Sequence, residues 1–320
     1  MYKISVVIPI YKVEEYIEKC CRSLFGQTLD DIEYVFVDDC SPDRSIDVLL
    51  KILNEFPDRI KDVKILRNKV NMGVSQTRRK GIGATTGEYV IHCDPDDWLE
   101  VTAYEKLYFY AKTKELDIVS CDYFKVDEFG LINKNQSPPL NGDILKMLLI
   151  SKMQGALWNR LVKSSIVKKT DIIYPLNDMA EDLVLVLQYY IIASTYGHLL
   201  EPLYYYNTNP KSISYFENID KLLNQANDMS QNKQLIASIF KRVNLHQKYS
   251  KEIIANKFFD KRWILPAIVS AKKCSLWMKI HPDINVSLYT CPYLSIKDLL
   301  TSFLVELRLY PLLRKVIRRR

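Results

Sequence analysis

The stretch GEYVIHCDPDDWLE, residues 87–100, carries an apolar segment directly into three carboxylates, Asp94, Asp96 and Asp97. The β-branched and aromatic residues before Asp94 are typical of a buried strand. Carboxylates this close together repel one another, by an amount that depends on how well water screens them. Whatever relieves this repulsion must come from other segments of the chain or from a bound ligand.

The first 127 residues alternate between apolar, strand-like runs and segments with helical periodicity. The predicted strands are 3–10, 32–39, 63–68, 88–94 and 117–126. Between the second and third of them a helix is predicted, with Ser41 as its N-cap and Pro42 at its first position. This alternation predicts an α/β fold in which a buried, mostly parallel sheet is covered by helices.

A second acidic pair, Asp38 and Asp39, ends another predicted strand. If both strands are parallel members of one sheet, these acids and those of residues 94–97 meet at the edge where such sheets bind ligands. One interpretation is solvated acidic turns, because Asp is common after strands. The other is a shared divalent cation, whose remaining ligands would be water and the phosphates of a nucleotide.

Several common site types are poorly supported by the sequence. The glycine cluster GIGATTG, from Gly81, follows a helix and precedes a strand, which is the reverse of the dinucleotide-binding order. The sequence contains no GxxxxGK[ST], HExxH or GxSxG motif. Its seven cysteines form no CxxC pair, which argues against a zinc site and fits a reducing compartment.

The net charge of +7 is unevenly distributed, because residues 221–320 hold 19 Lys and Arg against 6 Asp and Glu. A basic region of this kind indicates an anionic partner such as a phospholipid surface or nucleic acid, or simply a solvated helical face. The apolar run from Leu183 is shorter than the roughly 18 residues expected of a membrane span. We therefore expect a cytoplasmic protein.

Four motifs in the first hundred residues, taken together, resemble the family 2 glycosyltransferases, inverting enzymes of the GT-A fold that use nucleotide-sugar donors. The motifs are SVVIPIY (5–11), VDDCSPDRS (37–45), NMGVSQTRRKG (71–81) and GEYVIHCDPDDW (87–98), whose Asp94-Pro95-Asp96 resembles the DxD motif. The segments 156–161, 180–185 and 204–214 resemble the acceptor side of bacterial members. The resemblance implies a Rossmann-like GT-A domain over 1–220, with a nucleotide-sugar half (1–100) and an acceptor half (101–220). Residues 221–320 are expected to form a basic, mainly helical extension.

The resemblance also implies donor-binding roles for individual residues. Pro9 and Tyr11 would pass under a uracil base, although they could equally be an ordinary strand end. Asp39 would accept a hydrogen bond from that base, while Asp38 braces the loop, because alternate strand residues face opposite ways. Arg78 would reach the nucleotide or its diphosphate.

The acids of the fourth motif are assigned in the same way. Asp94 resembles the carboxylate that contacts the ribose, and Asp96 the ligand of a divalent cation, Mn²⁺ or Mg²⁺, which bridges to the diphosphate. Asp97 is the weakest candidate of the three.

The acceptor-side candidates are Trp158 and the acids of NDMAEDLVLVLQYY (177–190). Trp158 would lie near the acceptor or be an ordinary core aromatic. By resemblance, Asp182 is the catalytic base and Glu181 the fallback, with Asp178 a third acid nearby. The alternative is that these acids only favour the start of a helix through its dipole.

The function predicted on this basis is transfer of a sugar, from a UDP-sugar or other nucleotide-sugar, to a hydroxyl of a surface polysaccharide or lipid-linked glycan. One alternative is a nucleotidyltransferase, which would need a glycine-rich basic loop after the first strand. Another is a basic nucleic-acid-binding protein, which the net acidic motif-bearing half disfavours. The terminal LRLYPLLRKVIRRR (307–320) could lie on the inner face of an anionic membrane, or belong to a docked terminal helix.

Overall fold

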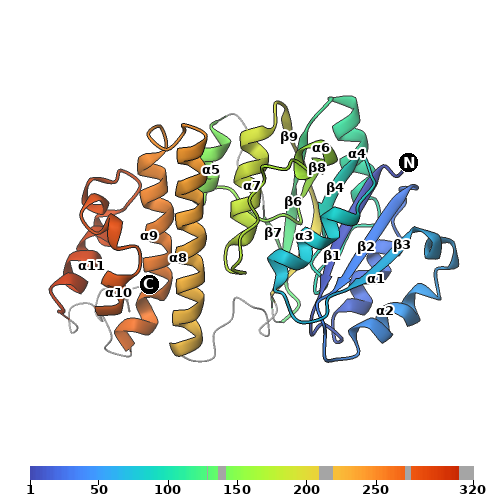
Figure 1. Ribbon diagram of the computed structural model, residues 1–320, viewed down its shortest axis with the longest axis horizontal. Helices are drawn as coiled ribbons and strands as arrows, with labels where there is room; N and C mark the ends of the chain where they lie inside the picture. The colour runs from blue at the N-terminus through green and yellow to red at the C-terminus, as the bar shows by residue number, and fades with distance from the viewer. Residues whose placement is uncertain (128, 136–141, 209–218, 271–274, 310–320) are drawn as a thin grey trace. The chain divides into compact units, whose positions relative to one another are not determined.

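The computed structural model describes residues 1–127, 129–135, 142–208, 219–270 and 275–309 (Figure 1). The chain divides into two compact units. Unit 1 comprises Met1–Gly142 and Gln154–Ser212, and unit 2 comprises Asp143–Met153 and Ile213–Arg320. The predicted domain boundary at residue 220 stays a prediction.

The strands of unit 1 form one sheet in the order β3-β2-β1-β4-β8-β6-β9-β5, with β7 paired to β6. They are β1 (Ile4–Ile10), β2 (Ile32–Asp38), β3 (Val63–Arg67), β4 (Tyr89–His92), β5 (Trp98–Leu99), β6 (Ile118–Val126), β7 (Ile132–Asn135), β8 (Arg160–Lys163) and β9 (Tyr196–Asn207). β1 pairs in parallel with both β2 and β4, and β2 in parallel with β3. The predicted fold class, with its mostly parallel sheet, is confirmed.

Helices cover both faces of the parallel part of this sheet (Figure 1). The helices of unit 1 are α1 (Ile17–Phe25), α2 (Ser45–Leu53), α3 (Val74–Ala84), α4 (Ala103–Thr113), α6 (Ser164–Val167) and α7 (Glu181–Ile192), with a 3-10 turn η1 (Pro57–Asp62). One core cluster joins the inward side chains of β1 and β2 to α1, α2 and α4. On the other face α3 packs closely, because a Cβ at Gly81 would lie 2.5 Å from Val7 Cγ1. α3 is therefore held directly on the sheet.

The predicted start of α2 is wrong by three residues, because the N-cap is Arg44 rather than Ser41 and the first helical residue is Ser45 rather than Pro42. The helix begins at Ser45, because the Asp43 carboxylate accepts hydrogen bonds from Ser41 Oγ (2.6 Å) and Ser45 Oγ (2.7 Å) and from the Glu14 amide (3.1 Å). Ser41 Oγ in turn accepts a bond from the Lys12 amide. Ser41 and its neighbours are thus used to hold the loop at the end of β1.

Unit 2 is helical, as predicted for the C-terminal extension. It contains α5 (Ile144–Leu149), α8 (Ile219–Arg242), α9 (Ser250–Ser270), α10 (Ser275–Lys279) and α11 (Ile296–Glu306), with the 3-10 turns η2 (Pro282–Ile284) and η3 (Ser287–Thr290). α8 and α9 lie side by side in Figure 1 and share a core around Phe258, Ile264 and Trp277. Within the described ranges, no helix has the length and apolar character needed to cross a membrane.

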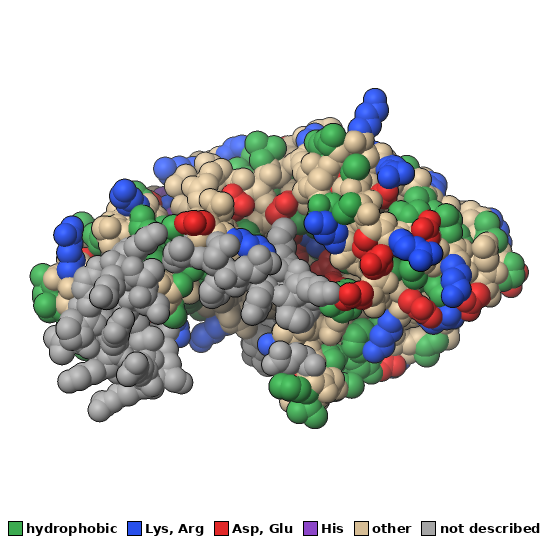
Figure 2. All heavy atoms as spheres, turned by 90° about the horizontal axis from the view of Figure 1, so that it is seen from below, with side chains coloured by type: hydrophobic (Ala, Val, Ile, Leu, Met, Phe, Trp, Pro, Cys, Tyr) green, Lys and Arg blue, Asp and Glu red, His purple; other side chains and the backbone are tan. Residues whose placement is uncertain are grey.

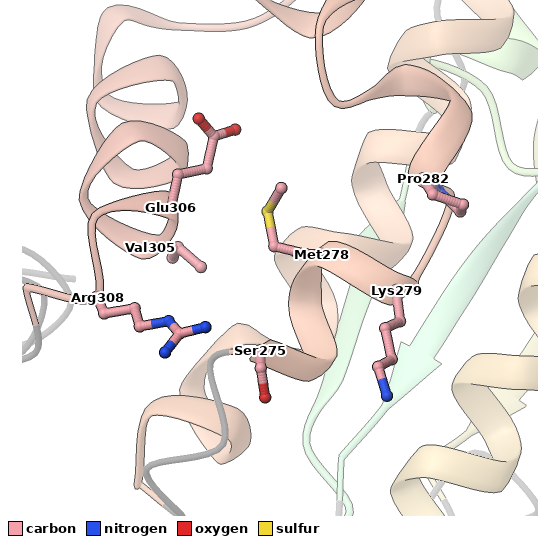
Figure 3. Close-up of a pocket in the computed structure, with 7 residues that line it drawn as sticks. All are labelled: Ser275, Met278, Lys279, Pro282, Val305, Glu306 and Arg308. Atoms are coloured by element: carbon pink, nitrogen blue, oxygen red, sulfur yellow. The ribbon is translucent and has the colours of Figure 1, made fainter.

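A cavity of about 480 Å³ lies between α10 and α11 of unit 2. In Figure 3 the side chains of Met278 and Arg308 reach towards this space, whereas Lys279 points away from them. None of the candidate site residues lines it. The residues of the sequence motifs lie in unit 1, away from this cavity.

Candidate active site

The acids that follow β2 and β4 come to the same edge of the sheet. β1 lies between these strands and pairs in parallel with both, so that Ile10 is opposite Asp38, and Val7 is opposite His92. The Asp39 amide donates to the Ile10 carbonyl at 2.9 Å, which extends the pairing by one residue. The predicted placement of the two acidic segments at one carboxyl edge is confirmed.

One buried arginine gathers the acids of three separate segments. Arg78, on α3, donates from Nη2 to Asp94 Oδ1 at 2.7 Å and from Nη1 to Asp182 Oδ1 at 2.6 Å. Nη1 also donates to Glu181 Oε1. The Arg78 side chain is only 4% exposed, so these charges interact with little screening by water. We call Arg78, Asp94, Glu181 and Asp182 the arginine cluster.

Burial and the excess of negative charge together determine the electrostatics of the arginine cluster. Burial alone would lower the pKa of Arg78, but Asp182, Asp94 and Glu181 raise it well above its usual value. Burial raises the pKa of Asp94 to about 6, an effect that Arg78 opposes and the neighbouring Asp182 and Asp96 carboxylates reinforce. Burial and the adjacent Asp182 raise the pKa of Glu181 well above its usual value. One guanidinium is thus shared by three carboxylates.

Asp182 is held from two directions. Its Oδ1 is bonded to Arg78, and its Oδ2 accepts a hydrogen bond from the Leu157 amide at 3.2 Å. It lies in the first turn of α7, whose N-cap Ala180 adopts the left-handed conformation with φ of 64°. Non-glycine residues rarely adopt this conformation, and such strain is often found at functional sites. Leu157 was not identified from the sequence, because a backbone amide leaves no motif.

His92 lies near Arg78, and no described residue forms a hydrogen bond with its ring. Both of its ring nitrogens are buried and unpaired among the described residues, as is Nε of Arg78. Burial and the nearby Arg78 charge lower the pKa of His92 well below its usual value. The imidazole is therefore neutral at pH 7, and His92 adds no charge beside the acids.

Asp97, the weakest candidate, ties the acidic loop to β9. Its Oδ2 accepts a bond from the Tyr204 hydroxyl at 2.6 Å and its Oδ1 from the Asn207 amide at 2.7 Å. Tyr204 Oη also accepts a bond from the Asp94 amide at 3.1 Å. Tyr204 lies in a segment recognised only by resemblance, of which residues 209–214 are outside the described ranges. This brace fixes the backbone that carries Asp94.

Asp38 and Asp39 both hold loops of the site. Asp38 accepts a hydrogen bond from the Ser41 amide and pairs with Arg67 at 3.0 Å, which agrees with a bracing role. Asp39 accepts bonds from Asn68 Nδ2 (2.7 Å) and from the amides of Met72 (2.8 Å) and Gly73 (3.0 Å). A carboxylate has about four lone-pair sites, so Asp39 keeps capacity for one further donor.

The remaining candidates differ in exposure. Pro9 is buried within β1, whereas Tyr11 just beyond the strand is 41% exposed. Asp96 is half-buried beside Asp94. Trp158 is only 3% exposed, and its ring is stacked on that of Tyr204 with 4.4 Å between centroids. In this conformation Trp158 is packed as a core aromatic, and its acceptor-side role stays a prediction.

The residues at this edge fit a divalent cation only if a ligand supplies most of the coordination. Among the described residues, no group of three or more His, Cys, Asp or Glu is placed to hold a metal ion. Asp96 nevertheless lies at an edge with surplus carboxylates. Burial is the main cause that raises the pKa of Asp97 well above its usual value, and the charges of Asp96 and Asp94 raise it further. A hard cation with one or two protein carboxylates and phosphate oxygens suits such a site.

Comparisons with known proteins show the fold and the family of this chain. The structure of S. aureus TarS 1–349 in complex with UDP-GlcNAc matches with a TM-score of 0.60 and 17% identity, covering 98% of this chain and 90% of that one. At this identity the likeness concerns the fold, which is a GT-A-like α/β domain with further helices. The model of Glycosyl transferase family 2 matches residues 5–169, more than half of the chain. The chain belongs to glycosyl transferase family 2.

Curated relatives agree with this assignment. The chain is 34% identical over 209 residues to the cholesterol galactosyltransferase of Borreliella burgdorferi, and the matched region covers 60% of this chain and 56% of that protein. It is 32% identical over 209 residues to the poly(ribitol-phosphate) beta-glucosyltransferase of Bacillus spizizenii, and here the matched region covers 64% of this chain and 32% of that protein. The chain thus spans about half of the first relative and a third of the second.

Proposed function

We propose that unit 1 transfers a sugar from a UDP-sugar to a hydroxyl group of a glycan or lipid-linked acceptor, with inversion at the anomeric carbon. The observation that carries this proposal is the arginine cluster, in which Arg78 joins Asp94 of the donor-side motif to Glu181 and Asp182. The names of the relatives, which describe galactosyl and glucosyl transfer, and the UDP-GlcNAc bound to TarS support a nucleotide-sugar donor.

The donor would bind across the carboxyl ends of β1, β2 and β4. Tyr11, exposed after β1, and Pro9 would contact the base, and the remaining acceptor capacity of Asp39 would take a hydrogen bond from it. Asp94 would accept a bond from the ribose, and Arg78 would lie beside the diphosphate. Binding across this edge follows the general rule for open α/β sheets.

Asp96 is the residue we assign to a divalent cation, Mn²⁺ or Mg²⁺. When bound, the cation supplies positive charge to the diphosphate that leaves. The protein's own contribution is to keep the Asp96 carboxylate at the edge, because Asp97 beside it is fixed to Tyr204 and Asn207.

Asp182 is the residue we assign as catalytic base. Inverting transfer needs one carboxylate that takes the proton of the attacking hydroxyl. Both acids of the pair bond Arg78, but only Asp182 is also held by a backbone amide from the 156–161 segment. Asp182, fixed by Arg78 and the Leu157 amide, is therefore assigned the role, with Glu181 as the fallback.

Nucleotide binding tests the donor site. Isothermal calorimetry with UDP and Mn²⁺ should show binding that EDTA abolishes and that Asp96→Ala weakens at least tenfold. Asp47→Ala is the matched control, since it removes an exposed carboxylate of α2 and should leave binding unchanged. Binding that is unchanged in EDTA would refute the metal assignment. A thermal-shift screen over UDP-, GDP-, CMP- and dTDP-sugars should favour UDP-sugars, and an equal response to GDP-sugars would refute the donor assignment.

The distribution of charged side chains on the surface of unit 1 does not favour nucleic acid as a partner. On the face shown in Figure 2, acidic and basic side chains are interspersed over unit 1, and this part of the molecule presents no continuous basic surface there. A phosphate backbone is usually bound by a basic patch or stripe. This face of unit 1 therefore gives no support to a nucleic-acid partner.

A further inference from the structure

The segment that leads into α7 is fastened to the first turn of α3. Ser75 Oγ donates to the Pro175 carbonyl at 2.7 Å, and Gln76 Nε2 donates to the same carbonyl at 2.9 Å. The Ser75 amide donates to Asp178 Oδ1 at 3.2 Å. The start of a helix has amides without intrahelical partners, and Asp178 satisfies one of them from a distant part of the chain.

The Asp178 carboxylate occupies the space where a side chain at position 73 would lie. Gly73, the N-cap of α3, has φ of 82°, a conformation that favours glycine. A Cβ at this position would lie 2.5 Å from Asp178 Oδ2 and 2.7 Å from Oδ1. The Gly73 amide is held on another side by Asp39 Oδ2, at 3.0 Å. The absence of a side chain at Gly73 is thus what lets Asp178 come this close.

A second tie lies one turn further along α3. Arg78 bonds Glu181 and Asp182, so residues 178–182 are attached to the same helix at both ends. Between the two ties, Ala180 is held in a left-handed conformation, which a non-glycine residue keeps only when the surrounding structure enforces it. The chain between the ties therefore has little freedom, and movement of Asp178 would be passed to Asp182.

We infer that Gly73 and Asp178 form a latch that fixes the position of Asp182, and that Asp178 is a positioning residue for the proposed transfer, on which this inference rests. The simpler interpretation is that Asp178 only satisfies an amide at the start of α3 and contributes to stability alone. The two readings differ in one respect. A positioning residue acts through Asp182, whereas a cap affects the protein whether or not Asp182 is intact.

A double-mutant cycle separates them, with kcat and donor KM measured for Asp178→Ala, Asp182→Asn and the double variant. We expect Asp178→Ala to lower kcat about 10- to 100-fold with donor KM within threefold, because small misplacements of a catalytic group are costly. In the Asp182→Asn background the same change should lower kcat by less than threefold. Asp178→Asn keeps an acceptor for the Ser75 amide and should restore kcat to within a few-fold of wild type.

Two further variants complete the design. Gly73→Ala, which crowds Asp178 directly, should reproduce the loss of kcat. Asp143→Ala is the matched control, because Asp143 caps α5 of unit 2 through the Lys146 amide at 3.1 Å, and it should leave kcat unchanged. Two results would overturn the latch alone. One is an equal loss of kcat from Asp178→Ala in the wild-type and Asp182→Asn backgrounds. The other is a wild-type kcat in Asp178→Ala when Asp182→Asn is inactive. Wild-type kcat in Asp182→Asn overturns the proposed base and the latch with it.

Discussion

At the scale of single residues, Arg78 does what no other side chain could do in its place. A planar guanidinium offers several N–H donors in a fixed arrangement, and here they reach Asp94, Glu181 and Asp182 at once. A lysine ammonium at the same position would be a single point of charge on a flexible stem. The cluster is therefore specific to arginine, and its neighbour Arg79 shares neither the burial nor these contacts.

Removal of the Arg78 charge should destabilise unit 1 severely. In Arg78→Met three neighbouring carboxylates lose their shared cation, and loss of one partner of a buried ion pair costs about 3–5 kcal/mol. Arg79→Met is the matched control and should change stability by about 0.5 kcal/mol or less, as is usual for an exposed side chain. Hydrogen exchange of the β1, β2 and β4 amides measures the free energy of unfolding of unit 1. Equal protection in the two variants would contradict this role for Arg78.

The residues of the cluster could be named from the sequence, but their contacts could not. Each belongs to a recognisable motif, yet Arg78 is 103 residues from Glu181 in the chain, and no local pattern links them. The latch was missed for the same reason, because Gly73 and Asp178 are ordinary turn and helix-start residues in sequence. The sequence allowed Trp158 to be either an acceptor-side residue or a core aromatic. Its stacking on Tyr204 depends on strand pairing that the sequence does not reveal.

At the scale of elements, α3 organises the site. It packs on β1 and β2 through Gly81, its first turn holds Asp178, and its second carries Arg78. Its existence followed from helical periodicity, but its role as a shared support did not. The first residue of α2 could not be predicted from local sequence either. Asp43 accepts hydrogen bonds from the amide and hydroxyl of Ser45, and such side-chain bonds compete with helix formation.

In unit 2, the buried Lys261 of α9 gives this element a pH-dependent stability. Burial lowers the pKa of Lys261 to about 7, although its Nζ donates to the Trp277 carbonyl and to Asn285 Oδ1, both at 2.8 Å. Between pH 7 and the ordinary lysine pKa of about 10.4, the unfolded chain binds more protons than the folded one. The free energy of unfolding should therefore rise with pH across this window, by at most about 1.4 kcal/mol per pH unit.

Lys261→Met tests this expectation. Urea unfolding of the wild type and the variant, at pH 6 and pH 9, should show that the wild type gains stability relative to the variant as the pH rises. A difference between the two proteins that does not change with pH would show that Lys261 keeps its proton throughout.

At the scale of the whole molecule, the regular alternation of strands and helices was enough to predict the class of fold. The meeting of the acidic segments at the carboxyl edge of the sheet followed from this alternation, because buried apolar strands with helical connections leave few arrangements other than a parallel sheet. Assignment of α5, residues 144–149, to unit 2 was not predicted, since a short helical segment carries no sign of its tertiary partners. Composition identified the basic character of residues 221–320, but it does not distinguish a membrane surface from a solvated face.

The basic end of the chain is the place to test for membrane contact. α11 ends at Glu306, Arg308 is exposed with φ of 57°, and residues 310–320 lie outside the described ranges. We expect the full chain to sediment with anionic phosphatidylserine vesicles and a version lacking 307–320 to bind them much less, because each basic residue near such a surface contributes about 1 kcal/mol. Neutral vesicles are the control, and equal sedimentation of both forms with anionic vesicles would contradict the expectation.

The central claim, that Asp182 is the base of an inverting sugar transfer at the edge of unit 1, is tested most directly by Asp182→Asn. The substitution keeps the size of the side chain and removes its ability to take a proton. Because general-base catalysis contributes about 10²–10⁴-fold, kcat should fall by that factor while UDP affinity, measured by calorimetry, stays within threefold of wild type. Glu181→Gln, made alongside, should lose less. Activity of Asp182→Asn within a few-fold of wild type would contradict the account.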